Sequence, residues 1–370
     1  MPTVLKKLKQ DQLFIGTTVA VILLSLFGRI NFSAISWSTV LSLLSLLTMV
    51  TLYQSLGLID ALADYLLKKA KTTRSLSVIL FLLAFFSAMV VTNDVAILTL
   101  LPLTFALAKK SALPLIKTAS LTAIYANLGS AASPIGNPQN IYLLAHYGIP
   151  FTHLFETAAL LLILGLATMP LFALTIPKTS IGSLVETAPV KKFNRFDVIL
   201  LITFTAVAFL SLITQKNLSV TLVMTFMVSS YFDQSVIEKV DYGVVISIAN
   251  FFLLVSALMT WPFIYQSLSA IGSSQAGIFA FGAVVSQIIS NVPAAALLAP
   301  FTEHVQALYL ALSVGGFGTL VASLANLLAY RQIKANHPQK TTKKFFKTFT
   351  WHNVLFLILG FALSYLDILF

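Results

Sequence analysis

Long apolar runs separated by short polar stretches follow one another from Gln12 to Phe370. A helix needs about 20 mainly apolar residues to cross the ~30 Å hydrocarbon core of a bilayer. The pattern predicts about nine full spans, at residues 12–28, 35–58, 116–147, 152–176, 196–213, 217–232, 242–260, 305–330 and 353–370. Two further apolar segments, 75–108 and 275–302, are each interrupted near the middle by polar residues, which predicts hairpins rather than single spans.

Composition agrees with this pattern. Charged side chains make up 9% of the sequence and hydrophobic ones 58%, whereas a soluble domain carries roughly 25% charged residues. A soluble fold is excluded, and the fold class is an all-α polytopic membrane protein. The sequence has no cysteine, and its five histidines do not have metal-ligand spacing. Disulfides and thiolate metal sites are therefore excluded, and a redox or metal centre is disfavoured.

The net charge of +11 reflects membrane topology. Arg74 precedes the first hairpin and Lys109 follows it, so the positive-inside rule places both of its ends in the cytoplasm. With that assignment, all but Arg29 and Lys216 of the 23 Lys and Arg residues fall on the cytoplasmic side. The N-terminus is then cytoplasmic and the C-terminus outside, in the cytoplasmic (inner) membrane. Lipid is the expected partner of these cations, and no nucleic acid is required.

The order span, span, hairpin, broken span, span occurs twice. The uncharged stretch from Thr260 to Gly272 before the second hairpin indicates that this hairpin opens outward. The two halves are thus inverted structural repeats, with two re-entrant hairpins and two discontinuous helices. The predicted parts are a first repeat at 1–177 (cytoplasmic-side hairpin 75–108, broken helix 116–147), a cytoplasmic linker and connecting span at 178–216, and a second repeat at 217–370 (outward-side hairpin 275–302, broken helix 305–330).

Prolines and glycines interrupt the two discontinuous helices. The stretch from Ser133 to Asn140 contains two prolines and a glycine, and Gly315 to Thr319 contains three glycines. Each second half-helix then presents unpaired N–H groups, which suit an anion, and each first half-helix ends in carbonyls, which suit a cation. Asn93, Asn137 and Asn291 are candidate N-caps of the returning helices, and Pro138 suits the first helical position after Asn137.

Asp94 is the only one of the 12 acidic residues that hydropathy places deep in the membrane. An ionisable group at that depth is functional by default, although a carboxylate that merely caps the returning helix is the alternative. The second hairpin has Val292 at the matching position, so only the first can titrate. No Lys or Arg is predicted at this depth. An anionic substrate would need amide N–H groups, hydroxyl groups and a co-bound cation.

These motifs resemble the ion transporter superfamily, and specifically its citrate-transporter-like proteins, which include divalent anion:sodium symporters and arsenite permeases. The resemblance covers essentially the whole chain. The residues that carry it are Thr92-Asn93-Asp94-Val95-Ala96, Pro134-Ile135-Gly136-Asn137-Pro138-Gln139-Asn140, Ser290-Asn291-Val292-Pro293 and Gly315 to Thr319. It implies an elevator-like mechanism and a homodimer, since members of the family commonly dimerise.

The resemblance also implies site residues. In the symporters each hairpin tip carries a Ser-Asn-Thr triplet that contacts sodium and substrate, and here the triplets are Thr92-Asn93-Asp94 and Ser290-Asn291-Val292. The implied sodium ligands are Thr92, Asn93, Ser133 and Gly136 at one site, and Ser290, Asn291, Gly315 and Gly316 at the other. The implied substrate contacts are Asn93, Asp94, Asn137, Pro138, Asn291, Val292 and Thr319. Replacement of both Thr positions disfavours a dicarboxylate, and an acid after the hairpin Asn resembles the arsenite permeases.

The expected function is secondary active transport of a small anion, coupled to sodium or protons, with Asp94 carrying the coupling cation and no other cofactor. An arsenite-like oxyanion exporter or a cation/proton antiporter would use the same residues, and a channel stays open as a further alternative. A membrane-embedded enzyme is disfavoured. Aspartyl protease chemistry needs two carboxylates at one site, and serine or metal chemistry needs a histidine at depth, whereas all five histidines lie near predicted span ends.

Overall fold

The computed structural model describes residues 4–5, 8–9, 11–26, 30–58, 70–134, 136–180, 193–214 and 216–369. Within these ranges the secondary structure is helical, apart from one isolated β-bridge between Thr72 and Ser180. Most of the predicted cytoplasmic linker, at 181–192, and Ile135 of the first helix break lie outside the described residues.

The helices follow the predicted order. Those of the first half and the connecting segment are α2 (Gln12–Ser25), η1 (Phe32–Ala34), α3 (Trp37–Ser55), α5 (Thr73–Val91), α6 (Asn93–Lys110), α7 (Leu115–Ala131), α8 (Pro138–Tyr147), α9 (Phe151–Thr157), α10 (Ala159–Leu174) and α11 (Arg195–Thr214). Those of the second half are α12 (Leu218–Phe232), α13 (Ser235–Lys239), α14 (Tyr242–Leu258), α15 (Pro262–Gly272), α16 (Gln275–Ile289), α17 (Asn291–Leu298), η2 (Ala299–Phe301), α18 (Val305–Gly315), α19 (Leu324–Asn336) and α20 (Gln339–Leu369).

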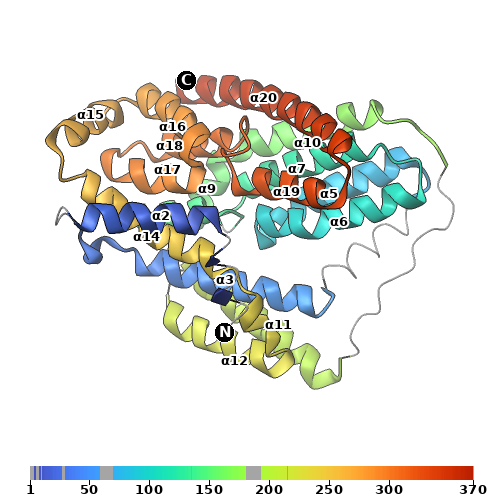
Figure 1. The fold of residues 1–370 in the computed structure, drawn as a ribbon, viewed down its shortest axis with the longest axis horizontal. Coiled ribbons are helices and arrows are strands. Elements are labelled where there is room, and N and C mark those ends of the chain that lie inside the picture. The colour runs from blue at the N-terminus through green and yellow to red at the C-terminus, as the bar shows by residue number, and fades with distance from the viewer. Residues whose placement is uncertain are drawn as a thin grey trace.

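The helices gather in two groups (Figure 1). The lower group contains α2, α3, α11, α12 and α14, in which α3 packs on α12 and α2 on α14, so each pair joins the two halves of the chain. The upper group contains the hairpin helices and the broken helices, with α5 against α7 and α16 against α18. The largest apolar core lies in the upper group and includes Phe81, Tyr125, Phe279 and Tyr309.

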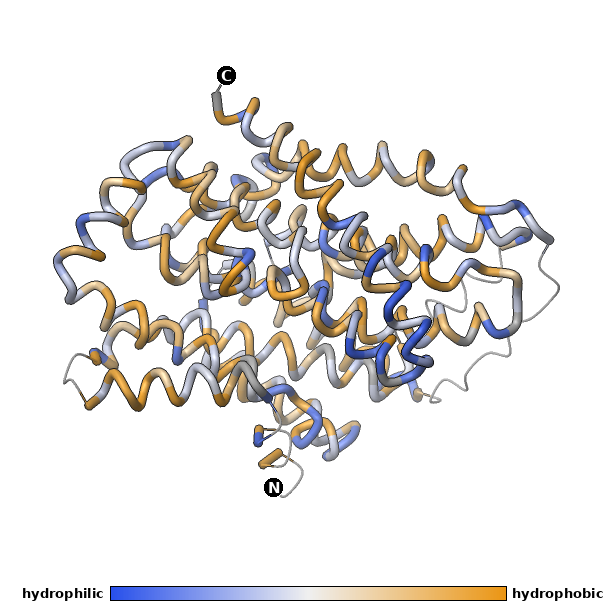
Figure 2. Tube along the Cα trace, turned by 45° about the horizontal axis from the view of Figure 1, so that its top comes forward, coloured by the Kyte–Doolittle hydropathy of each residue, from blue (hydrophilic) through white to orange (hydrophobic). Residues whose placement is uncertain are grey.

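The helices are apolar over most of their length (Figure 2), but many are shorter than the predicted spans. In the described ranges, three contain an 18-residue window apolar enough to cross a membrane, within Thr73–Val90, Arg195–Leu212 and Gln339–Ile368. Helices α2, α10, α12 and α14 have 14 to 17 residues, or about 21–26 Å at 1.5 Å per residue. Apolar runs overestimate helix length here because they include apolar turn residues.

Three predicted boundaries are corrected. The predicted span at 152–176 is divided at Ala158 into α9 and α10. The uncharged connection from Thr260 to Gly272 contains helix α15, which begins at Pro262 and is bent by 105° from α14. The last helix begins at Gln339 rather than near 353, because Lys and Gln are good helix formers and extend the helix beyond its apolar part.

Gly129 sets the distance between α5 and α7. A Cβ atom at this position would lie 1.9 Å from the carbonyl oxygen of Phe85. Backbone cannot withdraw from such a contact without moving a whole helix, so glycine is required for the close packing of these two helices.

We predict that Gly129→Ala destabilises the protein by about 1–3 kcal/mol or more, because the added methyl group overpacks the α5–α7 contact. The measurement is the melting temperature of the purified protein in detergent. Gly16→Ala is the control, since a Cβ at Gly16 meets nothing within 4 Å and alanine is the better helix former by about 1 kcal/mol. Equal melting temperatures for the two variants would contradict the prediction.

Candidate functional site

Each hairpin turns at a single residue. Thr92 separates α5 from α6 with φ 83° and ψ 151°, and Ser290 separates α16 from α17 with φ 73° and ψ 155°. Positive φ in a residue other than glycine costs on the order of 1–3 kcal/mol and persists only where surrounding contacts enforce it. The two turns therefore share one strained conformation, which both halves of the chain retain.

The predicted N-caps at the hairpin tips are wrong by one residue. Thr92 and Ser290 occupy the N-cap positions, without side-chain capping bonds, and Asn93 and Asn291 are the first helical residues. The positive φ angles place the cap at the turn itself, one residue before each asparagine. The prediction for α8 is correct in position, because Asn137 is its N-cap and Pro138 its first residue, although the Asn137 side chain makes no capping bond.

Both broken helices are closed by an asparagine of the following half-helix. The Asn140 amide donates hydrogen bonds to the carbonyls of Ser130 (3.0 Å) and Ser133 (2.7 Å). The Asn326 amide donates to the carbonyls of Gly316 (2.9 Å) and Thr319 (3.1 Å). In both cases the acceptors lie 10 and 7 residues before the asparagine. The same local structure therefore forms in both halves, although proline-rich sequence makes one break and glycine-rich sequence the other.

Each hairpin tip binds the break of its own half through the backbone. The amide N–H of Asn93 donates to the carbonyl of Gly136 at 3.1 Å, and that of Asn291 donates to the carbonyl of Ala322 at 3.0 Å. These bonds satisfy an N–H group at the start of each returning helix, where no intrahelical acceptor exists. In each half, the hairpin tip and the break of the discontinuous helix are thus joined in one unit.

Buried asparagines connect the two units. The Asn93 side chain donates to Asn127 Oδ1 at 2.9 Å and makes a longer contact with Ser323 Oγ at 3.5 Å. The Asn127 amide in turn donates to Asn326 Oδ1 at 2.8 Å. Asn127, Ser323 and Asn326 were not among the predicted site residues. Their signal in the sequence is a polar side chain within an apolar helix or just after its break, which is costly in a membrane unless paired.

A small cavity lies where the tips and breaks meet. Its volume is about 30 Å³. The predicted substrate residues that line it are Asn93, Asp94, Asn137, Pro138, Asn291 and Val292, together with Ser290 and Ser323. Thr319 is not brought to this cavity, because its hydroxyl donates to the carbonyl of Gln287 at 2.9 Å and its N–H to the Gln287 side chain. An ordered water needs about 10–15 Å³ of such volume, so a polyatomic anion would require the two units to separate.

The predicted sodium ligands differ between the halves. At the first tip Thr92 is 1% exposed, and its hydroxyl has no hydrogen-bond partner. At the second tip the Gly315 carbonyl accepts from Gln287 (2.8 Å), and the Gly316 carbonyl accepts from Asn326 (2.9 Å). Hard cations take oxygen ligands, and an unused buried hydroxyl fits that need better than oxygens already bonded to protein donors. The carbonyls of Ser133 and Gly136 at the first tip also accept protein hydrogen bonds, so the Thr92 hydroxyl is what distinguishes the first tip as a candidate cation site.

Asp94 lines two cavities. It lies in the first turn of α6, where its backbone N–H donates to Asn93 Oδ1 at 2.9 Å. Besides the small cavity, it lines a larger one of about 360 Å³ that also contains Thr92 and Asp241. Asp94 therefore borders both the convergence point of the tips and a wider space with a mostly apolar lining.

Comparison with known proteins places this architecture in a family. The family described as Citrate transporter matches residues 4–312. The chain belongs to the citrate transporter family. An uncharacterized transporter of Methanocaldococcus jannaschii is 28% identical over 329 residues, which cover 88% of this chain and 89% of that protein. The inner membrane protein YbiR of Escherichia coli is 28% identical over 305 residues, covering 81% and 80%.

A more limited similarity extends to a putative transporter, arsB, of Dictyostelium discoideum. It is 28% identical over 152 residues, which cover 41% of this chain and 27% of that protein. Family membership confirms the predicted resemblance and makes the chain a multi-pass membrane transporter rather than an enzyme. In this citrate transporter family member, the paired tips and breaks are the natural candidate for the transport site.

We predict that Asn127→Ala lowers the free energy of unfolding by about 1–3 kcal/mol, because it leaves buried amide groups on Asn93 and Asn326 unpaired. A double-mutant cycle with Asn326→Ala, followed by thermal melting, measures the coupling between the two side chains. Asn336→Ala at the exposed end of α19 is the matched control. Additive effects of the two substitutions would contradict an energetic link across the halves.

Proposed function

We propose that the chain is a secondary active transporter that moves a small anion across the cytoplasmic membrane, coupled to sodium or protons. One observation carries this proposal. Four helices begin around the same small cavity, since the first residues of α6, α8, α17 and α19 all line it. Helix N-termini carry a partial positive charge, and four of them together favour an anion, although the N–H groups of Asn93 and Asn291 already donate to the breaks.

The polar side chains of the cavity complement these helix ends. Asn93, Asn137 and Asn291 line it, and no Lys or Arg is among the described residues that do. An anion bound there would be held by dipoles rather than by a fixed positive charge, so its release would not require breaking an ion pair. The residual charge would be balanced by a co-bound cation next to Asp94 and Thr92. This arrangement supports the proposed coupling of anion and cation.

Alternating access follows from the two-fold arrangement. The hairpin α5–α6 lies on one side of the molecule and α16–α17 on the other, so that their tips approach each other near the middle (Figure 1). This arrangement supports two re-entrant hairpins in inverted repeats, while a cytoplasmic N-terminus and an outside C-terminus rest on the distribution of Lys and Arg. Separation of the tips toward one face or the other would open the cavity, and the lower group of helices would act as the scaffold for an elevator-like movement. A homodimer stays a prediction.

The position of Asp94 favours a second candidate function, export of an oxyanion or cation/proton antiport. A carboxylate at the cavity repels a substrate carboxylate unless it is protonated or paired with a cation. Export of an arsenite-like oxyanion, or cation/proton antiport, needs no such substrate carboxylate and uses the same acid. The partial similarity to a putative transporter named arsB is in line with this alternative.

Sodium binding can be tested without knowing the substrate. We predict that sodium raises the melting temperature of the purified protein above that in choline at equal ionic strength, because a ligand of the folded state stabilises it by RT ln(1 + [L]/Kd). Asp94→Asn should remove most of this rise. No sodium effect, together with a pH dependence of melting that disappears in Asp94→Asn, would favour protons and the oxyanion exporter instead.

The substrate site is tested by transport. We predict that Asn93→Ala and Asn291→Ala each reduce anion transport into proteoliposomes at least tenfold while expression is retained, since one lost charge-assisted hydrogen bond is worth about 1.5–3 kcal/mol. Citrate, sulfate and arsenite are the anions to screen, with imposed sodium and proton gradients. Asn336→Ala is again the control. Normal transport in both cavity variants would reject the site.

A further inference from the structure

A pocket lies at the turn between α19 and α20, apart from the candidate transport site. Its volume is about 510 Å³, and none of its described lining residues lines either cavity at Asp94. Helix α19 ends at Asn336 and α20 begins at Gln339, so a short turn connects them. The walls come mainly from the last two turns of α19 and the first two turns of α20. One corner of the chain therefore forms the pocket.

The pocket is positively charged. Lys334 and Lys343 line it, and no Asp or Glu is among the described residues that do. Neither lysine forms an ion pair with another described residue. Helix α19 contains no acid, and the acid of α20 is Asp367, which lies 24 residues beyond Lys343, or about 36 Å at 1.5 Å per residue. The two positive charges are therefore not balanced within the helices that form the pocket.

A nitrogen of the pocket wall has no hydrogen-bond partner. His337 lines the pocket, and its Nε2 atom is buried and unpaired in the described structure. Its ring packs edge-on against Phe105 of α6, with ring centroids 4.7 Å apart. Burial and the charge of Lys109, near the end of α6, lower the pKa of His337, so the ring is neutral at neutral pH. A neutral imidazole protonated at Nε2 can donate to an anion, and Lys109 adds positive charge at this corner.

The first turns of α20 extend beyond the hydrocarbon core of a bilayer. The helix has 31 residues, which span about 46 Å, whereas the core is ~30 Å thick. The basic residues of α20 all lie near its start, between Lys340 and Lys347. The positive-inside rule explains the side of the membrane on which they lie, but it does not require a pocket. The pocket therefore lies at the depth of lipid headgroups, where the helix N-terminus adds a partial positive charge.

An exposed apolar face leads from the pocket along α20. Phe346 is exposed at the pocket and packs against Tyr330, with ring centroids 6.0 Å apart. Trp351, Val354 and Ile358 follow and are also exposed. At 100° per residue these four side chains of α20 lie within about 140° of one another around the helix. Because aromatic side chains favour the boundary between headgroups and hydrocarbon, this face suits lipid chains that begin at the pocket.

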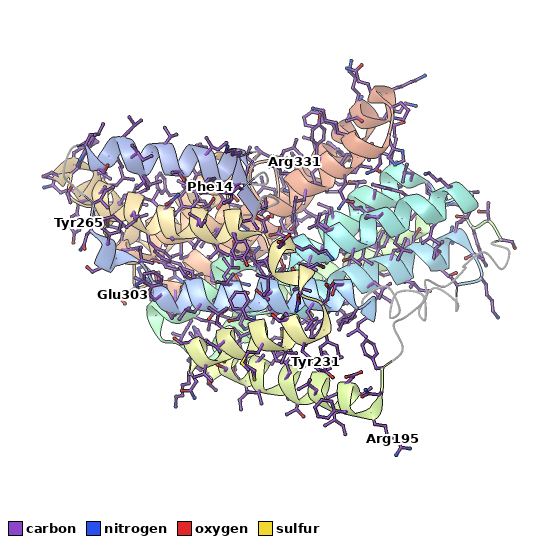
Figure 3. All side chains as sticks on the ribbon, turned by 60° about the horizontal axis from the view of Figure 1, so that its bottom comes forward. Phe14, Arg195, Tyr231, Tyr265, Glu303 and Arg331 are labelled. Atoms are coloured by element: carbon purple, nitrogen blue, oxygen red, sulfur yellow. The ribbon has the colours of Figure 1, made fainter. Side chains whose placement is uncertain are left out.

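Other cations of this segment lie outside the pocket. Arg331 lines a separate cavity next to the start of α2, and Figure 3 shows it near the end of α2 that carries Phe14. Lys340 and Lys344 are exposed on the first turns of α20 and are not among the described lining residues. The pocket therefore distinguishes Lys334 and Lys343 from neighbouring residues of the same charge.

We propose that this pocket binds the phosphate group of an anionic phospholipid, in the leaflet on the side that the sequence predicts to be cytoplasmic. Lys334 and Lys343 contact the phosphate, and the acyl chains lie along the exposed face of α20. Basic pockets between membrane helices bind lipid headgroups in this way. Free phosphate has the same charge, but it has no apolar part to cover Phe346 and Trp351. The site is independent of the proposed transport function and of the anion transported.

Tryptophan quenching tests this site. The chain has three tryptophans, and Trp37→Phe with Trp261→Phe leaves Trp351 as the reporter on α20. In phosphatidylcholine bilayers, we expect brominated phosphatidylglycerol, added as a minor lipid, to quench Trp351 with at least threefold higher apparent affinity than brominated phosphatidylcholine. Lys334→Gln with Lys343→Gln should remove most of this preference, because lysines near the membrane surface attract anionic lipid.

A matched control separates the pocket from the general positive charge of the segment. Lys340→Gln with Lys344→Gln removes the same charge from exposed positions outside the pocket, and it should retain the preference for phosphatidylglycerol. Equal losses in the two double variants would assign the effect to overall charge and overturn the pocket. The single variant Lys343→Gln replaces the double variant if the latter does not fold, as judged by its melting temperature.

Inorganic phosphate distinguishes a lipid from a soluble ligand. A site for free phosphate would show equal quenching by the two brominated lipids. It would also show a rise in melting temperature with inorganic phosphate at constant ionic strength, lost in Lys334→Gln with Lys343→Gln. That result would overturn the lipid assignment, as would equal quenching by the two lipids without any effect of phosphate.

Discussion

Every backbone group that leaves a helix inside a bilayer must find a partner within the protein, because hydrocarbon offers none. The breaks after α7 and α18 expose such groups, and Asn140 and Asn326 bind the freed carbonyls in the same pattern. The hairpin tips complete the arrangement, since the N–H groups of Asn93 and Asn291 donate to the breaks. The candidate site exists because these bonds allow helices to begin and end at mid-molecule.

The same constraint underlies the two proposed roles of the site, which are binding an anion on one side of Asp94 and a cation on the other. Helix N-termini gather at the small cavity, while Thr92, Asp94 and Asp241 are among the residues that line the larger one. Asp94 belongs to both spaces, so it is the residue through which the two ligands would affect each other. Val292 occupies the equivalent position in the second half and has no ionisable group that could contact a cation. The two halves are therefore alike in backbone but different in chemistry.

The connection between the halves is also polar. Asn127 and Asn326 join the two broken helices through their side chains, and Asn93 extends the chain to the first tip. A hydrogen-bonded amide network of this kind strongly specifies one arrangement, because any displacement leaves buried donors unpaired. Opening of the cavity would therefore require the network to break or to move as one body, and the close α5–α7 contact at Gly129 favours movement as one body within the first half.

The sequence by itself determined the class of the protein, the order of its helices and the positions of both hairpin turns and both helix breaks. These properties depend on local composition: apolar length, proline and glycine at the breaks, and Asn after each turn. The family resemblance also implied the tip and break residues Asn93, Asp94, Asn137, Pro138, Ser290, Asn291 and Val292 that line the small cavity, but not Ser247, Ile248 and Phe251 of α14. Local composition did not determine features that depend on packing. These are the helix lengths, the bend between α14 and α15, and the caps at Thr92 and Ser290.

Only the tertiary structure decided which distant polar residues join the site. Asn127 and Asn326 lie 199 residues apart and pair directly, whereas Thr319 hydrogen-bonds to Gln287 outside the small cavity. Asp11 and Asp241 lie near predicted helix ends, where hydropathy gives them no special status, yet they converge beside Gly243. Such contacts arise from the packing of helices from opposite halves, and the physical reason that sequence misses them is that hydropathy reports the depth of a residue and not its neighbours.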